Sequence, residues 1–214
     1  MLDLFIAAFV TFFVVIDPPG VAPIFATMTA QFPPAWRRRM AIKSVLIATG
    51  VLAAFAYGGQ WLLEKNLHVS LDAFRIAGGL LLFLIAIDML FEKRTERRTE
   101  RAEAVRDDLA AHPGTHDDIS VFPLAIPLIA GPGAIASAML YFAQNEAPAA
   151  RAAVLAGVGA NLALCLLAFL MAGPLTRLMG ATVAAMITRI FGIILAALAA
   201  QFVVDGVRGA FGLA

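Results

Sequence analysis

Two short segments rich in proline and glycine carry the residues best suited to bind a charged solute. They are Asp17-Pro18-Pro19-Gly20 and Gly131-Pro132-Gly133-Ala134, and each stands inside apolar sequence. Proline and glycine interrupt a helix and leave backbone groups without partners. Inside a membrane, such groups are tolerated only where they are buried in protein or line a polar cavity. Matching interruptions in the two halves of a hydrophobic chain indicate a transporter's binding site.

The first interruption contains its own anion, Asp17. An uncompensated carboxylate at the bilayer centre costs about 2.5–3.5 kcal/mol. Because Asp17 directly precedes Pro18, we predict that it caps a second half-helix. A further role as an ion or proton site stays open, with Asp17 and the carbonyl groups of Pro18 to Gly20 attracting an ammonium group or a coupling cation. The two roles compete, because a well-capped carboxylate titrates poorly.

The second interruption has no acidic residue. Gly131 can end one half-helix and Pro132 can begin the next, so that the free N–H groups of this end are available to a carboxylate or another anion. A kink repaired by internal contacts is the alternative. Asn161 is a third polar candidate, either as a packing contact or as a ligand contact. The predicted substrate-binding residues are Asp17, Pro18, Gly20, Gly131, Pro132, Gly133, Ala134 and Asn161.

The sequence predicts no catalytic residue, metal site or cofactor. An intramembrane aspartyl protease needs two carboxylates that share a proton, but Asp17 is the only deep one, and Asp88 lies near a span end. His112 and His116 are separated by Pro113, which disfavours a helix that presents both to a metal. We therefore expect no enzyme. Coupling of transport to H⁺ or Na⁺ stays open.

Composition predicts an all-α protein that crosses a membrane several times. Hydrophobic residues make up 61% of the 214 residues and charged residues 14%, with a mean hydropathy of +0.87. Soluble domains have roughly 45–50% apolar and about 25% charged residues. A span needs about 20 apolar residues. Six segments qualify, near 3–30, 41–63, 71–91, 119–144, 151–174 and 184–208.

Lysine and arginine predict the orientation, because cytoplasmic loops carry them in excess. Twelve lie in one set of alternate loops and span ends, and four, Lys65, Arg75, Arg151 and Arg208, lie in the other. We therefore expect a plasma (inner) membrane protein with both termini periplasmic or extracellular. The larger set is Arg37, Arg38, Arg39, Lys43, Lys93, Arg94, Arg97, Arg98, Arg101, Arg106, Arg177 and Arg189.

A weak internal repeat relates the two halves at an offset of 114 residues, which overlays Pro18 on Pro132 and Arg75 on Arg189. A unit of three spans is odd in number, so its second copy enters the membrane from the opposite face. We expect helices 1 and 4 to be broken at mid-membrane. The predicted divisions are 1–91, a charged cytoplasmic loop over 92–118, and 119–214. We expect that loop to be solvated, with partner docking as the alternative.

Three motifs carry a resemblance to the MarC family. Asp17–Phe25 resembles its signature "DPxGxxPxF", Phe122–Ile135 resembles "PLAxPLxAGPGAI", and Arg75–Gly79 resembles its third-span motif. Pro19 departs modestly from the branched residue that is common there. The resemblance implies an inner-membrane protein grouped with LysE-type amino-acid exporters, in a family associated with transport of small neutral amino acids.

The leading hypothesis is a secondary transporter of a small solute, such as a small neutral amino acid, working by alternating access. The alternative is a regulatory or structural membrane protein without transport activity. Expected partners are the lipid bilayer and a small-molecule substrate, with no nucleic acid. The small residues Gly157 and Gly159 permit either internal packing or a homo-oligomer.

Overall fold

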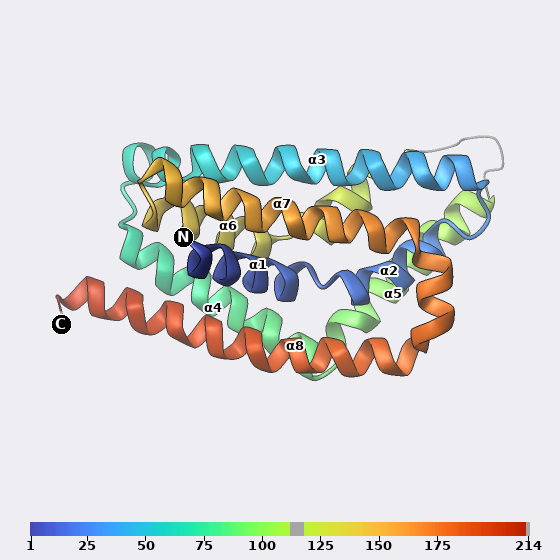
Figure 1. The fold of residues 1–214 in the computed structure, drawn as a ribbon. Coiled ribbons are helices and arrows are strands. Elements are labelled where there is room, and N and C mark those ends of the chain that lie inside the picture. Colours follow the sequence, from blue (N-terminus) through green and yellow to red (C-terminus); the bar gives the residue numbers. More distant parts are fainter. Residues whose placement is uncertain (112–117, 213–214) are drawn as a thin grey trace.

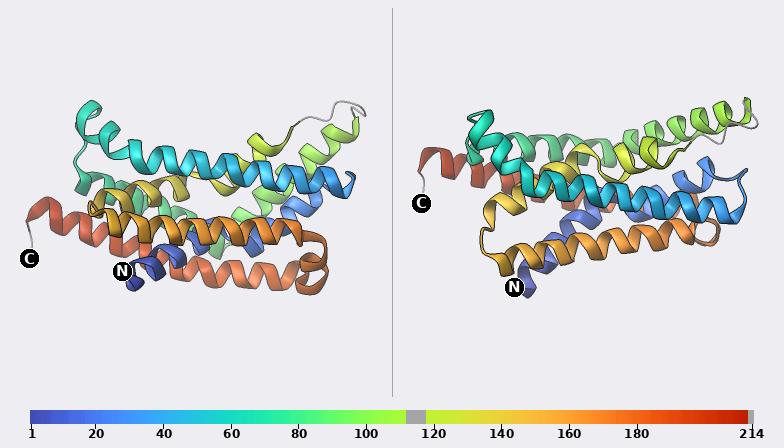
Figure 2. Two further views of the ribbon diagram at one scale, coloured as in Figure 1. Left: turned by 45° about the horizontal axis from the view of Figure 1, so that its top comes forward. Right: turned by 90° about the horizontal axis from the view of Figure 1, so that it is seen from above.

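The chain folds into a bundle of helices that run side by side along one axis (Figures 1 and 2). The computed structural model describes residues 1–111 and 118–212, and these contain no strand. Leu2–Ile16 and Pro18–Met28 form α1 and α2, and Ser120–Ile129 and Pro132–Gln144 form η2 and α6. The other elements are α3 (Pro34–Trp61), η1 (Leu62–Asn66), α4 (Leu71–Leu90), α5 (Lys93–Ala111), α7 (Pro148–Leu170) and α8 (Ala172–Phe211).

The helices agree with five of the six predicted spans, and with the sixth if one bent pair counts as a span. Five segments are long and apolar enough to cross a membrane, and η2 with α6 makes a sixth if that pair, bent by 60°, is one span. Gly180, with φ of +66°, interrupts α8, so its membrane-crossing part is Thr182–Phe211. The other four spans are Leu2–Met28, Pro34–Trp61, Leu71–Leu90 and Pro148–Leu170.

Close contacts of glycine backbone hold α4 and α8 together. A Cβ atom at Gly79 would lie 2.8 Å from the carbonyl oxygen of Ala199, and one at Gly206 would lie 2.8 Å from that of Asp72. Gly79 of α4 is paired with Ala199 of α8, and Asp72 is paired with Gly206. The numbers fall in one helix as they rise in the other, so the two helices are antiparallel. In a membrane, helices associate through such packing of small residues, because lipid is as apolar as the helix surface.

The charged segment after α4 is less solvated than expected for a cytoplasmic extension of the third span. Its described part is α5, a helix separated from α4 by Phe91 and Glu92, with φ of +61° at Glu92. Ala102 is fully buried, and the side chain of Arg98 is only 13% exposed. These two residues are shielded from solvent because the helical period places one stripe of residues on the side of α5 that faces the bundle. The two histidines at 112 and 116 lie outside the described residues.

Candidate functional site

The first interruption is capped by Asp17, as predicted. Asp17 has left-handed backbone angles (φ 60°, ψ 64°) between α1 and α2, and its Oδ1 accepts a hydrogen bond from the Gly20 N–H at 3.1 Å. Its Oδ2 accepts a second from Thr188 Oγ1 of α8 at 3.0 Å. A Cβ atom at position 20 would lie 2.1 Å from Asp17 Oδ2, so the cap requires glycine there.

Two arginines of α5 contact this interruption. Arg98 Nη1 lies 3.7 Å from Asp17 Oδ2. Arg94 Nη2 donates to the carbonyl oxygen of Val15 at 2.7 Å, and its Nη1 lies 3.0 Å from the sulfur of Met89. The last carbonyl groups of a helix have no partner within the helix. Arg94 therefore supplies a hydrogen-bond donor to one of the free carbonyl groups at the end of α1. Sequence reasoning missed both arginines as site residues, although their spacing of four residues was a visible signal.

The second interruption is open at the start of α6. Gly131 is the N-cap residue with extended backbone (φ −74°, ψ 170°), Pro132 is the first helical residue, and no side chain caps this end. Upstream, Phe122 and Ile126 have extended backbone angles within η2, and each precedes a proline, which disfavours helical angles. The predicted contrast is therefore present, with one helix start holding a carboxylate and the other holding none.

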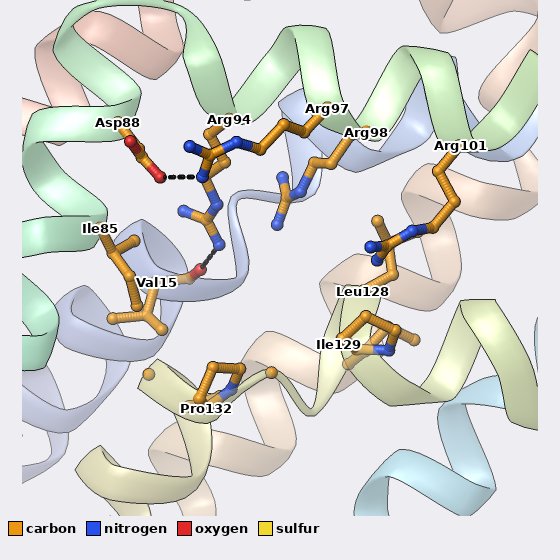
Figure 3. A pocket seen from close by; sticks show the side chains of 14 residues that line it. Val15, Ile85, Asp88, Arg94, Arg97, Arg98, Arg101, Leu128, Ile129 and Pro132 are labelled. Atoms are coloured by element: carbon orange, nitrogen blue, oxygen red, sulfur yellow. Dashed lines mark hydrogen bonds and ion pairs between the residues drawn. The ribbon is translucent and has the colours of Figure 1, made fainter.

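A cavity of about 260 Å³ lies between α5 and the start of α6. Figure 3 shows Arg94 extending from α5 to the Val15 carbonyl oxygen, Arg97 pointing towards Asp88, and Arg101 pointing towards Leu128. A single water needs only about 10–15 Å³ of such space, so a small solute fits. The lining consists of Val15, Ile85, Asp88, Arg94, Arg97, Arg98, Arg101, Pro127, Leu128, Ile129, Gly131, Pro132, Gly133 and Ala134.

Positive charge dominates this cavity. Asp88 is the one acidic residue among its described lining, and its Oδ2 accepts a hydrogen bond from Arg97 at 2.6 Å. Burial, followed by repulsion from Arg98, lowers the pKa of Arg94 to about 9, although Asp17 and Asp88 act in the opposite direction. Arg94 thus stays protonated at pH 7. Guanidinium groups beside a helix N-terminus form an arrangement that binds anions.

The structure brings only some of the predicted residues together. Gly131, Pro132, Gly133 and Ala134 line the cavity. Asp17, Pro18 and Gly20 lie at the first interruption, which meets the cavity through Val15 and Arg98 without lining it.

Asn161 lies elsewhere, on the face of α7 that packs against α1. Its Nδ2 donates to the carbonyl oxygen of Phe9 at 2.6 Å, and its Oδ1 is buried without a partner among the described residues. It is not part of the cavity lining, and a ligand-binding role for it stays a prediction.

Comparison with known proteins identifies the family. The model described as "MarC family integral membrane protein" matches residues 2–211. The chain belongs to the MarC family. This MarC protein is 37% identical over 209 residues to a UPF0056 membrane protein of Methanocaldococcus jannaschii, covering 98% of each chain. It is 34% identical over 211 residues to the UPF0056 membrane protein YvbG of Bacillus subtilis, covering 99% of this chain and 97% of that one. No solved structure matches it.

Proposed function

We propose that this MarC protein is an inner-membrane secondary transporter of a small solute that carries a carboxylate or another anionic group. The observation that carries the proposal is the cavity at the uncapped start of α6, which Gly133 and Ala134 line together with arginines of α5. A helix N-terminus attracts negative charge through its free N–H groups and its dipole. A small neutral amino acid falls within this proposal through its carboxylate.

Helix packing supports an alternating-access mechanism built on an inverted repeat. The first span packs against the fifth through α1 and α7, and the fourth packs against the second through α6 and α3. Exchanging the two halves of the chain converts one pair into the other, and the third and sixth spans, α4 and α8, pack against each other. Inverted repeats with a site at their interface suit rocking between two faces.

The cavity is accessible beside α5. The side chain of Arg97 is 66% exposed, and Arg101 is exposed as well. In the proposed orientation this end of the bundle faces the cytoplasm, because it also carries most of the lysine and arginine residues. The structure then corresponds to a state open to the cytoplasm, with the termini at the opposite end.

The test combines solute binding with flux. Purified protein is screened for thermal stabilisation by small amino acids, organic acids and inorganic anions, and the solutes that stabilise it are then tested for flux into proteoliposomes. We expect at least one anionic or zwitterionic solute both to stabilise the protein and to be transported. Absence of stabilisation and flux across the panel would overturn the proposal and favour a regulatory or structural role.

A matched pair of variants at position 131 ties the flux to the site. Gly131→Asp places a carboxylate at the uncapped helix start, as Asp17 does at the first interruption, and should abolish flux. Gly131→Asn has nearly the same shape and meets the same carbonyl oxygen of Pro127, 2.8 Å from the added Cβ atom, but adds no charge. It should retain more flux than the aspartate variant. Equal flux in the two variants would place the anion site elsewhere.

A further inference from the structure

We infer that the solute held in this cavity is a small dianion, bound by the guanidinium groups of Arg94 and Arg98 opposite the start of α6. The chemical class is a dicarboxylate or a doubly charged oxyanion such as phosphate or sulfate. This inference rests on the proposed function and adds the charge of the substrate.

The charges around the cavity do not balance. Arg97 is paired with Asp88, and Arg98 with Asp17. Arg94 contacts only neutral acceptors, the Val15 carbonyl oxygen and the Met89 sulfur. Within the described part of the chain, Arg101 has no hydrogen bond or ion pair. Two positive charges are therefore in excess. Arg94 is half-buried, and a buried charge without a counter-ion is costly, whereas Arg101 lies at the exposed edge of the cavity. A ligand with two negative charges neutralises both arginines, whereas a zwitterion has no net charge to offset them.

The donors available to such a ligand are also numerous. A guanidinium has five N–H donors, and Arg98 uses its donors in one ion pair of 3.7 Å, which is longer than the 2.7–2.9 Å typical of a charge-assisted hydrogen bond. Its side chain is 13% exposed, so it is largely desolvated. On the facing wall, Pro132 begins α6 (Figure 3), and Gly133 and Ala134 follow it in the uncapped first turn. Arginine binds carboxylates and phosphates in a bidentate manner.

An ammonium group finds no unpaired carboxylate among the described lining residues of the same cavity. Asp88 already accepts from Arg97 at 2.6 Å. The side chain of Asp17 is 1% exposed and contacts Gly20, Thr188 and Arg98. The amino group of a neutral amino acid would therefore lie among arginines without an available carboxylate in the described lining. This opposition of like charges favours a dianion over a zwitterion.

The test measures binding to the full-length protein in detergent at constant ionic strength. Succinate, phosphate and sulfate are compared with acetate, chloride and glycine by thermal shift and by calorimetry. We expect at least one dianion to bind more than tenfold more tightly than acetate or glycine. Comparing succinate with phosphate separates a dicarboxylate from a single oxyanion. Stabilisation only by added phosphatidylglycerol would overturn the inference, because the site would then hold a lipid headgroup.

Variants of α5 assign the binding to its arginines. Arg94→Gln should weaken dianion binding by about 10- to 100-fold, the loss expected when a hydrogen bond to a charged group is removed. Arg106→Gln is the matched control on the same helix, because Arg106 pairs with the exposed Asp107 and does not line the cavity. Should Arg94→Gln fail to fold, Arg101→Gln removes an exposed lining arginine and should still weaken binding.

The outcomes separate the two proposals. Dianion binding without flux would overturn the transporter and leave this inference standing. Transport of glycine with no preference for dianions would overturn this inference and leave the transporter standing. Unchanged dianion affinity in both arginine variants would also contradict it.

Discussion

Asp17 is stable inside a membrane span because three separate elements contact its carboxylate. Gly20 belongs to α2, Thr188 to α8 and Arg98 to α5. The Asp-Pro sequence predicts only the helix cap. The other two partners of Asp17, Thr188 and Arg98, lie 171 and 81 residues away from it in the chain. Ionisable groups in spans are expensive and pair with one another. Asp17 thus connects α2, α5 and α8 through its carboxylate. A role for Asp17 in coupling transport to H⁺ or Na⁺ stays a proposal.

At this residue, Asp17→Asn should destabilise the protein. Asparagine caps a helix about as well as aspartate, so the substitution mainly removes the charge opposite Arg98. Breaking a buried pair costs about 3–5 kcal/mol, because the remaining charge is left uncompensated. The free energy of unfolding, measured by denaturant titration in micelles, should fall by about this amount.

A double-mutant cycle with Arg98→Gln distinguishes this pairing from a general loss of packing. The double variant should be less destabilised than the sum of the single variants. Asp3→Asn, at an exposed position in the first turn of α1, is the control and should change stability by less than about 0.5 kcal/mol. Strict additivity would show that the two side chains are not coupled.

At the scale of the elements, helix contacts in this bundle depend on where each glycine faces. Gly79 of α4 lies against the backbone of α8, whereas nothing lies within 4 Å of a Cβ atom added at Gly58 of α3. Both stand in helices, where glycine costs about 1 kcal/mol relative to alanine. The helices and their ends could be predicted from local sequence, but the face that each glycine presents depends on the neighbouring helix.

The pair Gly79→Ala and Gly58→Ala tests this difference. The added methyl group at position 79 would lie 2.8 Å from both the Ala199 carbonyl oxygen and a Val203 methyl carbon, so α8 must move. We expect a loss of about 1–3 kcal/mol. Gly58→Ala should be neutral or gain up to about 1 kcal/mol. Melting temperatures in detergent compare the two, and equal effects would show that α4 and α8 do not approach this closely.

Both termini lie at one end of the molecule (Figure 1), and the opposite end is cationic because it carries Arg37, Arg38, Arg39 and Arg177. The connection between α2 and α3 and the short first part of α8 lie at the cationic end. Such an asymmetry orients a membrane protein with its positive end inside. The orientation could be predicted from the sequence because it depends on loop composition, and it stays a prediction until sidedness is measured.

Cysteine labelling in intact cells tests the orientation. The chain contains a single cysteine, Cys165, which is buried and is first replaced by alanine. Glu146→Cys and Arg177→Cys then add exposed thiols at opposite ends. A membrane-impermeant maleimide should label position 146 in intact cells and position 177 only after permeabilisation. The reverse pattern would invert the proposed topology.

The sequence by itself determined the spans, the two interruptions and the contrast between a capped and an uncapped helix start. These features are local, since apolar length, proline and glycine act within a few residues. Only the tertiary structure decided that α5 turns Arg94 and Arg98 towards the bundle, that Arg94 contacts Val15, and that Asn161 lies away from the cavity. A spacing of four residues predicts a stripe along a helix, but what the stripe faces depends on segments far away in the chain. The binding chemistry of this site therefore emerges from the packing of the charged helix against the two interruptions.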